Sequence, residues 1–532
     1  MRRIRVLDTT LRDGDQAAGF AFSAEQKITL ARALAEAGVD IIETGFPLSS
    51  PGELGICRRI ALDLAELPLD PVETQRPLTA VMCRGRLTDI KETVQIFQGG
   101  IPGVLHISLP VSKTHITAKF GKTETELLAL AREVVSFAAG LVPMVELGAE
   151  DASRADAAFL ADYCANALDA GAGIINIADT LGVLAPATIA NLVRFLCNAV
   201  SPFALGKAVL SVHCHNDFGL ACANTLAAIE AGCGQVEVSV SGIGERAGNA
   251  ALEEVLANLQ TRPELYHAQT RIRPEKMAPV LGLAAAAAGT AGSPMKPLSG
   301  WNIRAFSSGL HQQGLSKNTK TYAPVLPEPF TMVPERIVLS RHSGRAGVAL
   351  FARRYCGMDL DPQTLSQLTL LVKAASGVST GLTEFIRMLV DLHALTSAYP
   401  GPFIRTTGSE TTEMGGITRY RITATLSRYQ GPAFSEEAYP LTGTGASWTK
   451  VVLEAVSRCT GMELQLNRLG INGGGDTLRL YGEIRIQGKL YGIERIGSSP
   501  GLLLLDCCLD GVNGTVLAEL QETVRRPIRP YP

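Results

Sequence analysis

Short apolar runs alternate with longer amphipathic segments along the first half of the chain, from residue 3 to about 250. The runs are rich in β-branched residues, whereas the longer segments repeat apolar positions every three or four residues. Strands that alternate with helices in this way predict a parallel sheet built from βα units. Eight runs are predicted strands: 4–10, 39–46, 78–83, 103–112, 142–147, 173–180, 208–215 and 235–242. Eight such units predict an α/β fold of the TIM (β/α)8 barrel type.

The segment 23–38, "SAEQKITLARALAEAG", shows how the helices between these strands begin and end. Ser23 and Gln26 have the spacing of a capping box, in which each side chain bonds a free backbone group of the first turn. Gly38 follows the last apolar position, and glycine readily ends a helix in the left-handed conformation. We therefore expect a helix over this segment.

The pattern changes after about residue 270, which predicts three domains. The barrel is expected over 1–270, and helical linker subdomains are expected over 271–397. A Pro/Gly-rich break at 397–410 leads into the alternating segments 419–429 and 478–488, with a predicted helix at 447–461 between them. Residues 398–532 are therefore expected to form a separate α+β domain.

Composition excludes several classes of protein. The chain has a formal net charge of -2, with 46% hydrophobic and 19% charged residues, so we expect no nucleic-acid partner and no membrane partner. Its eleven cysteines include no C-x-x-C pair. This spacing indicates that the cysteines are small core residues of a protein in a reducing compartment. The chain passes from its first residues into a strand pattern, and we expect a cytoplasmic enzyme.

Polar residues gather where the predicted strands end. The chemistry of a (β/α)8 barrel lies at the carboxyl ends of its strands, and a polar group inside a barrel is costly unless it is paired or metal-bound. The residues at these positions are Asp8, Arg12, Asp13, Glu43, Arg84, His106, Ser108, Glu146, Glu150, Asp179, Thr180, His213, His215, Glu245, Arg246 and Asn249.

His213 and His215 stand two residues apart on the seventh predicted strand, in "SVHCHNDFG". Alternate residues of a strand point to the same side, so both imidazoles would face one point. With Asp13 they would form a mixed nitrogen and oxygen site suited to zinc, manganese, magnesium or iron. The alternative is that both histidines only form hydrogen bonds inside the barrel mouth.

Arg12 would place a permanent positive charge beside this site, where it could stabilise an enolate or alkoxide. The alternative for Arg12 is a surface salt bridge. The glycine-rich stretch 242–254 would bring Glu245, Arg246 and Asn249 to the same rim.

Three stretches carry a family resemblance: "LDTTLRDGDQ", "VHCHNDFGLACANTLAAIEAG" and "GIGERAGNAALEE". They resemble the signatures of the isopropylmalate synthase and homocitrate synthase family, and the likeness extends from residue 4 to about 350. The tail with "INGGGDTLRLYGEI" more loosely resembles the regulatory domain of isopropylmalate and citramalate synthases. Asp15 departs from the glutamate that is usual in the first stretch.

The resemblance implies a metal-dependent Claisen condensation of acetyl-CoA with a 2-oxo acid, followed by thioester hydrolysis, in a homodimer whose partner chain completes each active site. The implied ligands of a divalent ion (Mg, Mn or Zn) are Asp13, His213, His215 and Asn249. The implied catalytic residues are Arg12, Glu43, Glu150, Glu245 and His311, the last reaching the partner's barrel. The implied substrate contacts are Gln16, His106, Glu146 and Thr180.

The 2-oxo acid is the open point within the family. Glu146 on the fifth strand would repel a second carboxylate, which favours 2-isopropylmalate synthase activity on 2-oxoisovalerate. The stretch "LGAEDASRAD" instead resembles homocitrate synthases, which use 2-oxoglutarate, and Ala178 stands where many isopropylmalate synthases carry proline. A counter-charge could come from Lys113, His115, Arg84 or Arg86. Citramalate synthase is a third alternative, and a metal-dependent lyase or a non-catalytic binding relative is another class.

Overall fold

A computed structural model describes residues 1–67, 76–287, 293–300, 302–323, 336–374 and 385, together with parts of the C-terminal region. Those parts are 403–413, 420–429, 439–440, 443–445, 453, 456–457, 463–474, 477–486 and 489–497. The chain divides into two compact units, of which the first consists mainly of Met1–Ala288 and the second includes Gly300–Val325 and Val333–Pro532.

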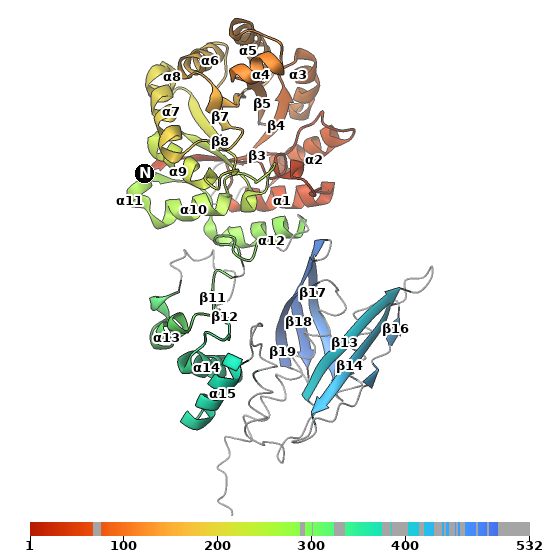
Figure 1. Ribbon diagram of the computed structural model, residues 1–532. Coiled ribbons are helices and arrows are strands. Elements are labelled where there is room, and N and C mark those ends of the chain that lie inside the picture. The colour runs from red at the N-terminus through yellow and green to blue at the C-terminus, as the bar shows by residue number, and fades with distance from the viewer. Residues whose placement is uncertain are drawn as a thin grey trace, which may run out of the picture. The chain divides into compact units, whose positions relative to one another are not determined.

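The first unit is a closed barrel of eight parallel strands, in the order β2 to β9 (Figure 1). Each of the eight predicted strands is present, so the predicted (β/α)8 barrel is confirmed. The strands are β2 Arg5–Asp8, β3 Ile41–Glu43, β4 Leu78–Arg84, β5 Gly103–Pro110, β6 Val145–Glu150, β7 Ile174–Asp179, β8 Val209–Cys214 and β9 Gln235–Val238. A short parallel pair, β1 Arg2–Arg3 with β10 Ala268–Gln269, lies outside the barrel.

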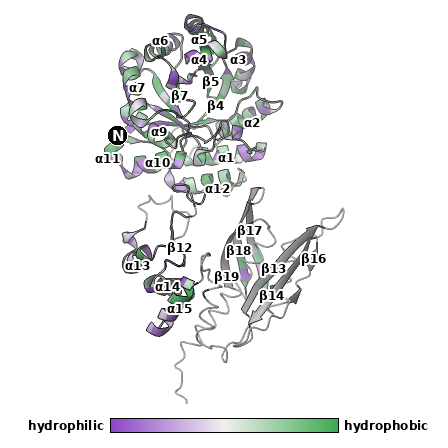
Figure 2. Cartoon of the chain, viewed as in Figure 1, coloured by the Kyte–Doolittle hydropathy of each residue, from purple (hydrophilic) through white to green (hydrophobic). Residues whose placement is uncertain are grey.

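Helices surround the barrel, and their apolar faces pack on the outer faces of the strands to form one large core. Hydrophobic and hydrophilic residues are mixed within the outer helices (Figure 2), as an amphipathic shell requires. The helices are α1 Ala24–Ala37, α2 Glu53–Glu66, α3 Leu87–Thr93, α4 Lys113–Ala118, α5 Glu124–Ala139, α6 Ala157–Asp169, α7 Pro186–Ala199, α8 Ser201–Ala204, α9 Ala221–Ala231, α10 Leu252–Thr261, α11 Pro263–Tyr266 and α12 Met277–Ala287.

Helix α1 begins and ends as its sequence predicts. The Ser23 side chain accepts a hydrogen bond from the Gln26 backbone N–H, and the Gln26 side chain accepts one from the Ser23 backbone N–H. Gly38 ends the helix with a φ of 89°, in the left-handed region. A side chain there would also meet the backbone oxygen of Arg271, so two independent constraints require glycine.

The barrel interior is apolar near the strand beginnings and polar above. Side chains near the beginnings of the strands form a small separate apolar cluster: Leu7, Ile41, Ala80, Val104 and Ile174, packed against Leu78, Met144 and Val209. Since side chains of a strand alternate between its two faces, the next inward positions lie two residues further along. Six of these are polar and buried or nearly so: Thr9, Glu43, His106, Glu146, Asn176 and Ser211. A polar layer therefore rests on an apolar floor.

The second unit contains a helical part. A short parallel pair, β11 Ala305–Phe306 with β12 Arg336–Ile337, packs with helices α13 Gly309–Lys317, α14 Arg345–Phe351 and α15 Pro362–Ala374 around a core of its own. The buried Gln312 amide holds this part together, because its Nε2 donates to the backbone oxygens of Phe306 and Val338, both at 2.9 Å.

The described C-terminal segments form two antiparallel sheets. One contains β13 Phe403–Glu413, β14 Tyr420–Tyr429, β15 Tyr439–Pro440 and β16 Gly443–Gly445, and the other β17 Leu464–Gly474, β18 Thr477–Ile486 and β19 Lys489–Gly497. The alternating segments predicted at 419–429 and 478–488 are therefore strands. The helix predicted at 447–461 falls almost entirely outside the described residues.

Among the helices that the structure describes, none is long and apolar enough to span a bilayer.

A buried ion triad anchors the loop that follows β2. Lys27, on α1 and 1% exposed, contacts Asp15 Oδ2 at 2.8 Å and Glu53 Oε1 at 2.6 Å. Asp15 lies in the short turn η1 Gly14–Gln16, and its Oδ1 accepts a hydrogen bond from the Phe22 N–H. The triad therefore ties this loop to the first two outer helices.

Replacing Lys27 with methionine should destabilise the barrel by about 3 kcal/mol, because it leaves the largely buried Glu53 and the partly exposed Asp15 without their cation. The shift in the chemical denaturation midpoint measures this loss. Arg59→Met is the matched control, since Arg59 and Glu25 form an ion pair with side chains 61% and 73% exposed. Equal midpoints for the two variants would contradict the anchoring role.

Candidate metal centre and active site

Four candidate ligands meet at the carboxyl end of the barrel. His213 is on β8 and His215 follows it, while Asp13 comes from the loop after β2. Asn249 follows β9 and pairs with His215 through an isolated β-bridge. Because β2 and β9 are neighbours in the closed barrel, residues more than 230 positions apart come together here.

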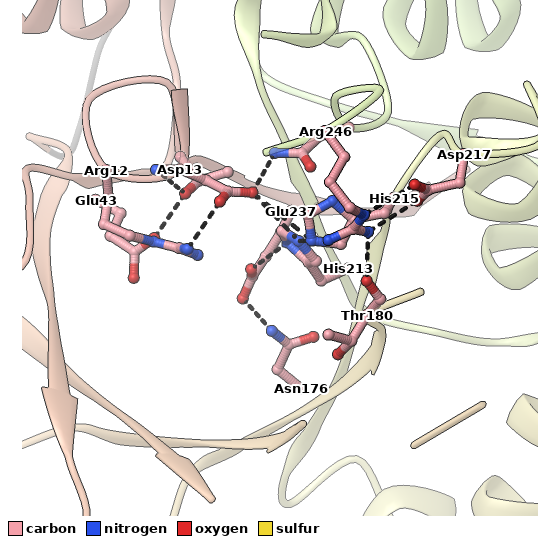
Figure 3. Close-up of polar contacts among 12 residues, drawn as sticks. Arg12, Asp13, Glu43, Asn176, Thr180, His213, His215, Asp217, Glu237 and Arg246 are labelled. Carbon is pink, nitrogen blue, oxygen red and sulfur yellow. Dashed lines mark hydrogen bonds and ion pairs between the residues drawn. The ribbon is translucent and has the colours of Figure 1, made fainter. Parts of the chain in front are cut away.

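The ligand atoms of Asp13, His213 and His215 lie within 4.8 Å of one another, and all three residues are buried. His213 Nε2 is 3.6 Å from Asp13 Oδ2, and His215 Nε2 is 3.9 Å from the same oxygen. The two Nε2 atoms are 3.2 Å apart. Figure 3 shows Asp13 between Arg12 and the two histidines.

The chemistry of these donors fits a divalent metal ion. Asn249 Nδ2 donates to Asp13 Oδ2 at 2.6 Å, and Asn249 Oδ1 is buried without a hydrogen-bond partner. Burial and the neighbouring His213 lower the pKa of His215 to about 3, so its imidazole is neutral and can offer a lone pair. Burial disfavours the charge of Asp13, but Arg12 and the histidines outweigh it and lower the pKa of this carboxyl. Two imidazoles, a carboxylate and an amide oxygen form a mixed site for such an ion.

Glycines shape the loop that carries Asn249. A side chain at Gly244 would come within 2.7 Å of Asn249 Nδ2, and one at Gly248 would meet the backbone oxygen of Gly242 at 2.0 Å. Gly248 also has a φ of 88°. The loop can therefore close around the Asn249 amide only with glycine at these two positions.

Arg12 joins the metal centre to the polar layer. Its Nε donates to Glu43 Oε2 at 2.6 Å, and its NH1 lies 3.2 Å from Asp13 Oδ1. Glu43 also accepts from Thr9 Oγ1 at 2.7 Å and pairs with His106 Nδ1 at 2.8 Å. Burial opposes the charge of Glu43, but Arg12 and His106 hold its pKa below the usual range. The Arg12 side chain is only 11% exposed and contacts two buried carboxylates, so the pair is not the surface salt bridge considered from the sequence.

His106 is the second cation of the layer. Burial opposes its charge, but Glu237 and the hydrogen bond to Glu43 raise its pKa to about 9. His106 also accounts for the glycine at position 148 on the neighbouring strand β6. A Cβ at Gly148 would lie only 2.9 Å from His106 Nε2.

Two residues that the sequence did not single out, Glu237 and Asn176, contact His213 directly and through Glu237, respectively. Glu237 Oε2 pairs with His213 Nδ1 at 2.9 Å, and Glu237 Oε1 accepts from Asn176 Nδ2 at 2.5 Å. The alternation of Gln235 and Glu237 on β9, continued by Ser239 directly after it, is the signal that could have identified Glu237, because it places polar groups on one face of a buried strand.

The structure places Glu146 deep inside the barrel. It belongs to the polar layer, is fully buried, and accepts hydrogen bonds from Gln235 Nε2 at 3.0 and 3.2 Å. Burial, with the nearby Glu237, raises the pKa of Glu146 to about 8. A side chain that is protonated at neutral pH does not repel a second carboxylate, so Glu146 does not disfavour 2-oxoglutarate by its charge. A substrate contact by Glu146 stays a prediction.

An arginine clamp links three loops at the rim of the barrel. Arg246 donates from Nε and NH2 to the two oxygens of Asp217, both at 2.8 Å, and from NH2 to the Thr180 backbone oxygen at 2.6 Å. Its φ of 55° is in the left-handed region, which is costly for a residue with a side chain. The Thr180 hydroxyl accepts from the Asp151 N–H at 2.8 Å.

Glu150 also lies at the rim, at the end of β6. Lys119 Nζ is 2.7 and 2.8 Å from its two oxygens, and His115 Nδ1 is 3.5 Å from Oε1. Arg84, another candidate counter-charge, pairs with Asp89 at 2.5 Å. Of these basic candidates, His115 lies near Glu150, and the active-site role of Glu150 stays a prediction.

Three predicted site residues lie outside this cluster. Gln16 and Glu245 are exposed on the loops that also carry Asp13 and Asn249. His311 is exposed on α13 in the second compact unit, where its ring stacks on Tyr322 with centroids 4.1 Å apart. The roles assigned to these three residues stay predictions.

Known proteins resemble this chain along most of its length. A family model described as HMGL-like matches residues 3–280, and one described as homocitrate synthase post-HMGL domain-like matches residues 299–379. The 2-isopropylmalate synthase of Solidesulfovibrio magneticus is 41% identical over 343 residues, which are 64% of each chain. That of Pyrococcus furiosus is 33% identical over 498 residues, 93% of this chain and 95% of the relative. Hydroxymethylglutaryl-CoA lyase from Pseudomonas aeruginosa superposes with a TM-score of 0.45 at 20% identity, over 55% of this chain and 95% of that one.

Asp8 should make the stability of the barrel depend on pH. It is fully buried, with Oδ1 bonded by the Thr10 N–H and Oδ2 without a hydrogen-bond partner, and burial raises its pKa from 3.8 to about 7. Between these values the folded chain keeps a proton that the unfolded chain loses, so stability falls as pH rises through this window. Asp8→Asn should remove that dependence.

The advantage of Asp8→Asn over the parent in denaturation midpoint should therefore be larger at pH 8 than at pH 5. The exposed Asp169, at the end of α6, provides the control substitution Asp169→Asn. An advantage of Asp8→Asn that is the same at both pH values would show that Asp8 is ionised in the folded chain throughout.

Proposed function

This chain belongs to the HMGL-like family, and on that premise we propose that it is an acyltransferase that condenses acetyl-CoA with a 2-oxo acid. Its substrate is 2-oxoisovalerate, and the activity is that of a 2-isopropylmalate synthase. The observation that carries this proposal is the alignment with a 2-isopropylmalate synthase over 93% of the chain, which includes the barrel and most of the C-terminal region. The cluster of Asp13, His213 and His215 supports it, because the reaction needs an activated ketone.

The reaction forms one carbon–carbon bond and breaks one thioester. A base removes a proton from the acetyl methyl group, and the resulting enolate carbon attacks the keto carbon of the 2-oxo acid. The keto oxygen then takes a proton, and water cleaves the thioester to release coenzyme A and a carboxylate. A divalent ion held by Asp13, His213, His215 and Asn249 would polarise the keto group.

Arg12 is proposed to stabilise the negative charge that develops on oxygen during the attack. Its guanidinium is oriented by Glu43 before substrate arrives, so little reorganisation is needed at the moment of reaction. The Thr180 hydroxyl accepts one hydrogen bond from the chain and keeps its own proton for the carboxylate of the 2-oxo acid.

The remaining assignments are proposals that rest on the family. Glu150 is an active-site carboxylate, and His106, Glu146 and Gln16 contact the substrates. His311, with Glu245, takes part in proton transfer from the partner chain of a homodimer. The exposed position of His311 is compatible with this role. The protein works in the cytoplasm, and the C-terminal domain regulates it.

Coenzyme A release should depend on the 2-oxo acid, and a thiol reagent measures it. We expect the highest kcat/KM with 2-oxoisovalerate, lower values with 2-oxoglutarate and pyruvate, and only background release without a 2-oxo acid. A preference for 2-oxoglutarate would indicate a homocitrate synthase, and one for pyruvate a citramalate synthase. No release with any of the three would favour a lyase or a binding protein.

Removal of divalent ions with a chelator should abolish this release, and Mg²⁺, Mn²⁺ or Zn²⁺ should restore it. His213→Ala should lose most of the bound metal because it removes one of two nitrogen ligands. His267→Ala, at an exposed position after α11, is the control and should keep its metal content. Full metal content in His213→Ala would refute the ligand assignment.

A further inference from the structure

We propose that Glu237 is a positioning residue that holds His213 ready to bind the metal ion, and that Asn176 holds Glu237 in turn. This inference rests on the metal centre of the proposed function. It concerns how strongly the centre binds its ion, which the identity of the four ligands alone does not determine.

Both oxygens of Glu237 are occupied. Oε2 pairs with His213 Nδ1 at 2.9 Å, and Oε1 accepts from Asn176 Nδ2 at 2.5 Å, with Glu237 only 1% exposed (Figure 3). In the β8–β9 pairing His213 lies directly opposite Glu237, so both side chains point into the barrel at the same level. Asn176 reaches the other oxygen from β7, which is not a neighbour of β9. Three strands thus fix the position of one carboxylate.

The pairing selects one form of the His213 ring. A carboxylate accepts hydrogen bonds, so the bond to Oε2 places the ring hydrogen on Nδ1. Nε2 then carries the lone pair, and this is the atom that faces Asp13 and His215. A carboxylate behind a histidine ligand fixes the tautomer and the ring orientation and raises the basicity of the ligand.

The two histidines are supported differently. His215 Nδ1 is buried without a hydrogen-bond partner, whereas His213 Nδ1 has a carboxylate. The barrel therefore orients the ring of His213 before the metal ion binds. Loss of Glu237 should weaken metal binding through its effect on His213.

Glu146 provides a matched control for burial of a carboxyl group. It is fully buried in the polar layer and accepts hydrogen bonds from Gln235 Nε2, which is not a metal ligand. A glutamine at this position still offers Gln235 an oxygen. A glutamine at position 237 must instead turn its NH2 group toward one of two donors, Asn176 Nδ2 or His213 Nδ1, so at least one bond is lost.

The experiment compares parent, Glu237→Gln and Glu146→Gln as metal-free full-length proteins. Affinity for Zn²⁺ alone is measured by competition with a chromophoric chelator. We expect Glu237→Gln to bind Zn²⁺ about 10–100-fold more weakly and Glu146→Gln to stay within about twofold of the parent. The ¹⁵N shifts of the histidine rings should show the Nδ1–H form of His213 in the parent and a loss of that form in Glu237→Gln. Melting temperatures of the metal-free variants report whether each is folded.

Unchanged affinity in Glu237→Gln, or an equal loss in Glu146→Gln, would overturn the inference. If Glu237→Gln does not fold, Asn176→Ala replaces it: this variant keeps the carboxylate but frees it, and should weaken Zn²⁺ binding in the same direction. Parent-like affinity in Asn176→Ala would then reject the network. A parent protein that binds no Zn²⁺ would instead refute the metal centre of the proposed function.

Discussion

The paired contact of Arg12 with Glu43 and Asp13 is the interaction on which the site depends. A barrel interior excludes water, so an isolated charge there is costly, while a charge with a hydrogen-bonded partner is tolerated. The Arg12 guanidinium reaches both carboxylates because its donors diverge, which a lysine ammonium could not reproduce with the same geometry. Glu43 is secured in turn by Thr9 and His106. The orientation of Asp13 toward the histidines therefore depends on a chain of contacts that begins in the polar layer.

Buried charge is also balanced by hydrogen-bonded partners on the histidine side of the barrel. Glu237 is surrounded by Asn176 and His213 as donors, and its charge helps to raise the pKa of His106. Glu146 belongs to the polar layer, and burial together with the nearby Glu237 raises its pKa, although Gln235 donates a hydrogen bond to it. The pKa of a buried carboxyl group therefore depends on its neighbours as well as on its depth.

Three of the five described non-glycine residues with positive φ lie around the opening of the barrel. Asp151, Ser241 and Arg246 are non-glycine residues with φ between 55° and 62°, and all three lie on loops that follow β6 or β9. Such conformations persist where neighbouring contacts hold them, and they concentrate at functional sites. Arg246 illustrates this, because its side chain bonds Asp217 and the Thr180 carbonyl. The strained loops surround a rigid interior, in which apolar residues fill the floor and the ion triad of Lys27 secures the first loop.

The sequence by itself determined the barrel, the spacing of His213 and His215, and the ends of helix α1, because each follows from a local period or a local cap. Asp13 and Asn249 could be selected as strand-end residues and by their family motifs. Depth inside the barrel could not be predicted: Glu146 and Glu150 both lie on the inner face of β6, yet one is fully buried and the other lies at the rim. The contact of Glu237 with a metal ligand was also decided only by the tertiary structure. Alternation along a strand shows which face a side chain occupies, whereas its level and its partners depend on how eight strands align when the barrel closes.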